Sequence, residues 1–295
     1  MEIACDESGA DGENLVGGNT LFFAHGSVNV PVEFAAALIA ETRERIRSPA
    51  EEYKANHLLR EKHRAVLEWL LEALPGRAHV VLVHKESFLV ERVVEVLGGS
   101  ADDAVALSRA EFGAQVWTAF LRAANRLLRV RADVDSAVLV TEFLDSIDAL
   151  RGSGTGTGTG VPLPHLTEIR ERAYAYRAGI PTLIPLLDPL FPTIVDTAAH
   201  WSADGTPVHL VHDRQTLLTP ARIEWLGERA RARNVALAGM RLVQARYDPR
   251  VQLADFLAGI ARKIAGDEVS GSGDPVLGDL LRPYLRGNPL KNAIT

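Results

Sequence analysis

Two neighbouring acidic residues, Asp6 and Glu7, follow a short apolar run at the start of the sequence and precede Ser8 and Gly9. Carboxylates at strand ends are suited to Mg²⁺, a hard cation that prefers oxygen ligands. Successive residues of a strand point to opposite faces, so both acids can face one ion only if the strand ends between them. The alternative is an ordinary turn, which Asp, Ser and Gly also favour.

A second pair of polar residues, Gln252 and Asp255, lies three positions apart in a predicted helix and therefore shares one face of it. The apolar residues around them place Asp255 near the buried side of the helix, where a carboxylate requires a partner. Gly259, one turn later, would allow the helix to approach a sheet closely. The alternative, an acid favoured by the helix dipole, fits poorly because Asp255 lies beyond the first turn.

A third acid, Asp213, ends the strand predicted over residues 206–213 and shares a face of it with His209 and Val211. The carboxyl ends of strands in α/β sheets are the usual positions for ligand contacts. An aspartate in the turn after a strand is an equally good interpretation.

Lys54, two residues after Glu52, follows a break in helical pattern at Pro49. A lysine at this position could contact a phosphate or offset the charge of the carboxylates; a solvated loop lysine is the alternative. The nine histidines show no spacing typical of a zinc site. The single cysteine, Cys5, is interpreted as a small buried hydrophobe because the adjacent Asp6 disfavours its thiolate.

The elements that must position these residues alternate between strand and helix patterns, which predicts an α/β fold with a mixed central sheet. After Pro249, the last helix is expected to end near Ile264, and the tail from Gly266 is expected to be irregular. Strands are predicted at residues 2–6, 20–28, 79–84, 206–213 and 236–243, and helices at 31–47, 62–74, 110–130, 166–178, 183–199, 220–233 and 249–264.

The stretch from about residue 87 to 200 is mostly helical in pattern and is predicted to be an insertion in a single domain spanning residues 1–295. Within it, residues 151–160 read RGSGTGTGTG, a composition without core residues that is typical of a flexible linker.

The composition excludes some classes of protein. A formal net charge of −6 and a pI near 5.9 argue against a strongly basic, high-affinity duplex binder. The apolar stretches are too short for a membrane helix, and the N-terminal residues lack the pattern of a signal peptide. With one cysteine, the sequence predicts a soluble, cytoplasmic protein without a membrane partner.

The DESG segment at residues 6–9 and the QLADFLAG segment at 252–259 together resemble the bacterial DUF3800 family, whose pattern is an early Asp-Glu and a late Gln-x-x-Asp. Glu52 and Lys54 match a further Glu-x-Lys element of that family. The resemblance implies a ribonuclease-H-like α/β core, in which Asp213 resembles the second carboxylate. The family brings no settled activity.

The sequence as a whole favours a Mg²⁺- or Mn²⁺-dependent phosphodiesterase or nuclease. Asp6, Asp213 and Asp255 are the expected metal ligands; Glu7 is a ligand or base, and Gln252 orients substrate or a carboxylate. Lys54 and Ser8 are the expected substrate contacts, with single-stranded nucleic acid or a nucleotide as partner. The alternatives are a non-catalytic interaction protein with the same fold and a small-nucleotide phosphohydrolase.

Overall fold

The computed structural model describes residues 1–47, 55–109, 112–131, 134–153 and 163–286. The chain forms two compact units. Unit 1 comprises Met1–Ala10, Phe22–Val83 and the chain from Pro189 onward, and unit 2 comprises Asp11–Leu21 and His84–Asp188.

Unit 1 is built on a five-stranded mixed sheet with the strand order β3-β2-β1-β4-β5. β1 is antiparallel to β2 and parallel to β4, and β4 is parallel to β5. The predicted α/β class with a mixed sheet is therefore confirmed, and all five predicted strands are present. The strands are β1 (Glu2–Ser8), β2 (Phe22–Val28), β3 (Ala78–His84), β4 (Val208–Asp213) and β5 (Leu237–Val243).

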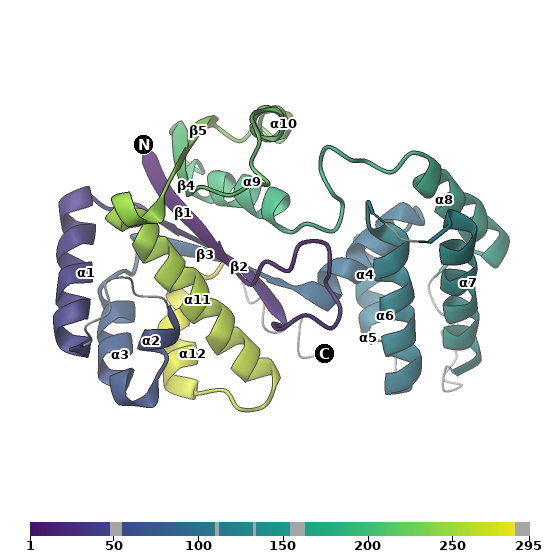
Figure 1. Ribbon diagram of the computed structural model, residues 1–295, viewed down its shortest axis with the longest axis horizontal. Helices are drawn as coiled ribbons and strands as arrows, with labels where there is room; N and C mark the ends of the chain where they lie inside the picture. The colour runs from purple at the N-terminus through teal and green to yellow at the C-terminus, as the bar shows by residue number, and fades with distance from the viewer. Residues whose placement is uncertain (48–54, 110–111, 132–133, 154–162, 287–295) are drawn as a thin grey trace. The chain divides into compact units, whose positions relative to one another are not determined.

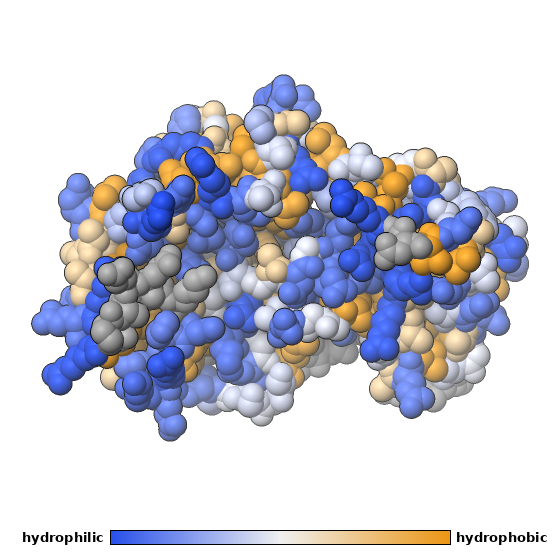
Figure 2. All heavy atoms as spheres, in the orientation of Figure 1, coloured by the Kyte–Doolittle hydropathy of each residue, from blue (hydrophilic) through white to orange (hydrophobic). Residues whose placement is uncertain are grey.

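One face of the sheet is covered by the long helix α11 (Pro249–Val269), which crosses it beside the other helices of this layer (Figure 1). Alternate strand residues, among them Ala4, Ala24 and Val211, form the main core with apolar residues of α11. The outward surface of α1, α3 and α12 is mostly hydrophilic (Figure 2). The other elements of this layer are α1 (Val32–Ile46), α2 (Ala55–Leu58), η1 (Glu61–His63), α3 (Arg64–Glu72), η2 (Ala245–Tyr247), α12 (Pro275–Leu281) and η3 (Arg282–Tyr284).

The last helix begins as the sequence predicts but ends later. Asp248 caps it by accepting a hydrogen bond from the backbone of Arg250, and Pro249 occupies its first turn. The prediction of an irregular tail from Gly266 is wrong, because α11 continues to Val269 and α12 follows. Asp274 caps α12 by accepting hydrogen bonds from two backbone N–H groups, and the buried Leu281 and Tyr284 hold this segment in the core.

The opposite face of the sheet is covered by α9 (Leu190–Trp201) and α10 (Pro220–Ala232). α9 contacts β2 and β4, and α10 contacts α9 and β5. Helices therefore lie on both faces of the sheet. Within the described residues, no helix is both long and apolar enough to cross a membrane.

Unit 2 is helical apart from its Asp11–Leu21 segment. That segment is fixed by Lys85, a nearly fully buried lysine whose ammonium pairs with Asp11 and donates to Thr20 over 2.7 Å. The predicted helical section 87–200 is thus divided, because α9 lies in unit 1. Residues 151–153 of the predicted linker end α7, and residues 154–160 lie outside the described chain. The helices are α4 (Lys85–Val96), α5 (Ala101–Arg109), α6 (Ala114–Leu128), α7 (Ser136–Ser153) and α8 (Leu166–Ala178).

Candidate active site

The candidate site lies in unit 1, where the carboxyl ends of β1 and β4 are adjacent. The parallel register pairs Cys5 with His212, so Asp6 and Asp213 are the next residues along their strands. β1 and β4 are therefore neighbours in the sheet. Both acids lie two residues beyond core residues that pack with α11, Ala4 and Val211, and strand alternation therefore turns both acids towards α11.

Helix α11 reaches this end of the sheet because β2 carries a glycine where the helix crosses it. Gly26 pairs with Asp6 across the β1–β2 register. A Cβ atom on Gly26 would lie 2.5 Å from the carbonyl oxygen of Ala254 and 3.0 Å from the backbone nitrogen of Ala258, so only glycine permits this approach. Asp255 lies in the turn of α11 between those two alanines, and the sheet-side glycine thus brings it to Asp6.

The expectation that Gly259 approaches the sheet is met by Ser8 of β1, whose hydroxyl would lie 3.8 Å from an added Cβ, but a helix lies closer still. A Cβ atom on Gly259 would collide with the side chain of Ala55 in α2. Gly259 therefore allows α2 to pack against α11.

The side chain of Asp6 is 7% exposed and is surrounded by like charge. One oxygen accepts a hydrogen bond of 2.7 Å from the backbone N–H of Glu7. Burial, together with the nearby carboxylates of Glu7, Asp255 and Asp213, raises the pKa of the Asp6 carboxyl to about 10. A positive charge at this point would relieve both the burial and the repulsion.

Asp213 and Gln252 both hold the connection that leads into α11. Asp213 Oδ1 accepts a hydrogen bond of 2.8 Å from the backbone N–H of Ala245, and Gln252 Nε2 donates over 3.0 Å to the carbonyl oxygen of the same residue. The contact occupies one of the two oxygens of Asp213. Gln252 thereby acts in the described structure as a positioning residue for the start of α11.

Ser8 lies on the α11 face and accepts a hydrogen bond of 3.0 Å from Nε of Arg262. Arg262 lies seven residues after Asp255, two helical turns away on the same face of α11. The sequence reasoning missed this cation, although its spacing from Asp255 could have revealed it. In addition to Lys54, Arg262 is therefore a second basic residue that could contact a phosphate.

Glu7 points to the other face of the sheet, because β1 continues to Ser8 instead of ending between the two acids. Its Oε2 lies 3.7 Å from Nε2 of His212 and is buried without a hydrogen-bond donor among the described residues. His212 in turn lies 3.2 Å, Nε2 to Nε2, from His25, whose Nδ1 contacts the Thr197 hydroxyl over 2.8 Å. Glu7 is thus close to Asp6 in space but lies on the opposite face of the sheet from Asp6 and Asp213.

The tautomers of the two histidines in this buried hydrogen-bond network follow from the acceptors around them. His212 Nδ1 lies 2.9 Å from the backbone oxygen of Asp213 and must donate to it. His212 Nε2 is then the acceptor, so His25 Nε2 donates to it and His25 Nδ1 accepts from the Thr197 hydroxyl. Burial lowers the pKa of His25 well below its usual value, which keeps the His25 ring neutral.

Comparison of the chain with protein-family models, curated proteins and solved structures gives no match.

The donor chemistry of the three aspartates fits a hard divalent cation such as Mg²⁺ or Mn²⁺. Among the residues that the structure describes, however, no three histidine, cysteine or acidic side chains are arranged to hold an ion together. Lys54 and Glu52 lie outside the described residues. The feature that favours a cation is the environment of Asp6, a buried acid with carboxylates as its charged neighbours.

Proposed function

We propose that this protein is a Mg²⁺- or Mn²⁺-dependent phosphodiester hydrolase whose metal ligands are Asp6, Asp213 and Asp255. The observation that carries the proposal is their convergence: three separate elements, β1, β4 and α11, bring these acids to one end of one sheet face. The resemblance to the DUF3800 family and to a ribonuclease-H-like core belongs to the same proposal.

A bound divalent cation would supply Lewis acidity and neutralise charge on a phosphoryl group. The chain's own residues provide the rest. Asp6, which is buried, fixes the inner edge of the site, while Gln252 holds the start of α11 so that Asp255 keeps its position. Ser8 and Arg262 lie at the outer edge, where the guanidinium offsets phosphate charge. Lys54 is retained as a further substrate contact.

The proposed substrate is a single strand, a strand end or a nucleotide. Long duplexes are held mainly by release of counterions from many phosphates, which requires a broad basic surface. A net charge of −6 does not provide one. A short substrate needs only the local charge of the metal and one or two basic side chains.

The test is cleavage of labelled RNA, DNA and nucleotides in Mg²⁺, Mn²⁺ or EDTA. We expect activity in the metals and none in EDTA, with most of it removed by Asp6→Asn or Asp255→Asn. Asp279→Asn is the matched control, since it makes the same change at an exposed surface acid. Activity that persisted in both site variants would contradict the proposal.

The second candidate is a non-catalytic protein that keeps this fold as an interaction platform. It is favoured by the lack, among the described residues, of three side chains arranged to enclose an ion. It predicts that no phosphodiester is cleaved under any condition of the panel and that Mn²⁺ leaves the melting temperature unchanged.

A further inference from the structure

A separate cavity of about 300 Å³ lies between β3 and α9. Its residues His79 and Val81 alternate along β3 with Val80 and Leu82, which belong to the α11-side core. Strand alternation therefore places this cavity on the face of the sheet opposite to Asp6. Its volume is at the lower end of the range of small-molecule sites.

The most unusual wall of the cavity is His79, whose side chain is held firmly but lacks polar partners. The residue is 4% exposed, and neither ring nitrogen has a hydrogen-bond partner among the described residues. Its ring stacks on His200 with a centroid distance of 3.7 Å and an interplanar angle of 9°, and its backbone oxygen accepts a hydrogen bond from Ser27. Buried polar groups are normally paired, so a fixed imidazole with two buried, unpaired nitrogens is an unusual wall for a cavity.

The imidazole is neutral. Burial lowers the pKa of His79 to about 3, with contributions from His200 and Arg286. The neutral ring therefore adds no charge to this wall of the cavity.

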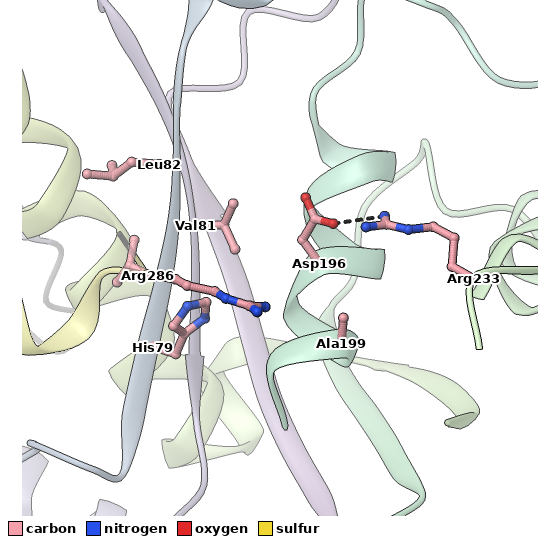
Figure 3. A pocket seen from close by; sticks show the side chains of 8 residues that line it. His79, Val81, Leu82, Asp196, Ala199, Arg233 and Arg286 are labelled. Atoms are coloured by element: carbon pink, nitrogen blue, oxygen red, sulfur yellow. Dashed lines mark hydrogen bonds and ion pairs between the residues drawn. The ribbon is translucent and has the colours of Figure 1, made fainter. Parts of the chain in front are cut away.

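The charge of the cavity is positive. Arg233 pairs with Asp196 over 2.8 Å, which neutralises both. Arg286 extends beside His79 into the cavity (Figure 3), and within the described chain no carboxylate lies at ion-pair distance from it. One guanidinium therefore remains to receive an anion.

The remaining walls are apolar and face each other. Val81 projects from β3 and Ala199 lies on α9, so the space between the charged ends is bounded by hydrocarbon (Figure 3). An occupant must therefore combine a small apolar body with an acidic group.

We propose that this cavity binds a small organic anion, with its carboxylate or phosphate on Arg286 and its apolar body between Val81 and Ala199, beside the ring of His79. The site differs in chemistry from the carboxylate cluster, which repels anions when no metal is present. Binding measured in EDTA therefore reports on the cavity alone.

The test is titration of the full chain with phenyl phosphate and with benzoate in EDTA. Binding is measured by calorimetry and by ligand-observed NMR. Benzyl alcohol serves as an uncharged probe of the same size. We expect saturable binding of at least one anion and much weaker binding of the alcohol. Arg286→Gln should weaken the anion at least about tenfold, since a charge-assisted hydrogen bond is the strongest contact on offer.

Arg231→Gln is the matched control, an exposed arginine near the end of α10 that does not line the cavity. It should bind the anion as the unaltered protein does. His79→Phe keeps an aromatic ring on His200 and removes both nitrogens; because these nitrogens are buried, the variant should bind the anion as the unaltered protein does. If this variant does not fold, Arg286→Gln decides, because Arg286 is exposed. Absence of saturable binding, or equal binding to Arg286→Gln, would overturn the proposal.

Discussion

Asp6 and Gly26 pair directly across the antiparallel β1–β2 ladder, and the backbone of α11 rests on the glycine. The acid is thus held beside a point of the sheet where a helix approaches to backbone contact. This close approach places Asp255 near Asp6. The packing of α11 on β2 and the electrostatics of the site therefore both depend on Gly26.

Gly26→Ala should therefore disturb the site without altering any acid. The added methyl group would overlap the Ala254 carbonyl and force α11 outward. We expect a loss of about 1–3 kcal/mol in the free energy of unfolding, typical of overpacking, measured by urea denaturation. Gly227→Ala in α10 is the control, because its Cβ would meet nothing within 4 Å. An unchanged Gly26→Ala protein would show that α11 does not rest on β2 there.

Millimolar Mn²⁺ should raise the melting temperature, because the ion binds the native state and relieves its repelling carboxylates. Asp6→Asn should abolish this rise, whereas Asp279→Asn should preserve it. The measurement is thermal unfolding with Mn²⁺ and with EDTA. An identical response of the wild type and Asp6→Asn would show that the cluster does not bind the ion.

Without metal, Asp6→Asn should be no less stable than the wild type at neutral pH. The pKa of Asp6 is raised from 3.8 to about 10 in the folded protein, so folding disfavours the ionised form. The wild type therefore loses stability as the pH rises from the lower value towards the upper. Asn cannot ionise and should flatten this part of the stability curve, measured by denaturation in EDTA between neutral and alkaline pH.

Acid should destabilise unit 1 through His79. Its pKa falls from 6.5 to about 3 on folding, so its neutral form adds stability that is complete above 6.5 and is lost as the pH falls towards 3. The charged groups around it are His200, Arg286, Asp196 and Arg233. One such group contributes a slope of about 1.4 kcal/mol per pH unit in that window.

His79→Phe should remove that part of the acid sensitivity, seen as a shallower fall of the denaturation midpoint between neutral pH and pH 5. His209→Gln, a change at an exposed histidine of β4, should leave the wild-type slope unchanged. Equal slopes for His79→Phe and the wild type would mean that His79 is not neutral and buried as described.

Gln252→Ala should affect stability more than metal binding. Its side chain holds the carbonyl of Ala245, and the loss of one hydrogen bond costs about 0.5–1.5 kcal/mol. The Mn²⁺ midpoint should change little, because the aspartates remain. Gln244→Ala, one residue before η2, is the control. Loss of the Mn²⁺ response in Gln252→Ala alone would assign the side chain a direct role at the ion.

Much of the frame of the site could be predicted from sequence, because its signals are local. Alternating β-branched runs marked the strands, and Asp248 with Pro249 marked the start of α11. Asp6 and Asp213 could both be identified as acids at strand ends, and the pairing of β1 with β4 brings them side by side.

The rest depended on contacts between distant residues. The side of the sheet to which Glu7 points depends on whether β1 ends at residue 6 or at residue 8. Strand pairing decides this difference of two residues. Gly26 appeared in the sequence as an ordinary strand residue, because its importance comes from α11 more than two hundred positions later. The cavity at His79 is likewise assembled from β3, α9, the residue after α10 and Arg286 beyond η3, so no short motif marks it.

The division of the chain into units has a consequence for the order of folding. During synthesis β1 emerges first, but its parallel neighbour β4 follows about two hundred residues later, after the whole of unit 2. The helices of unit 2 make contacts close in sequence and can form early, whereas β1 must wait for β4 and α11. Until then its apolar residues and its hydrogen-bonding edge towards β4 are exposed, and this is the stage at which a nascent chain is most prone to aggregate. The acidic residues of the candidate site are thus assembled among the last parts of the protein.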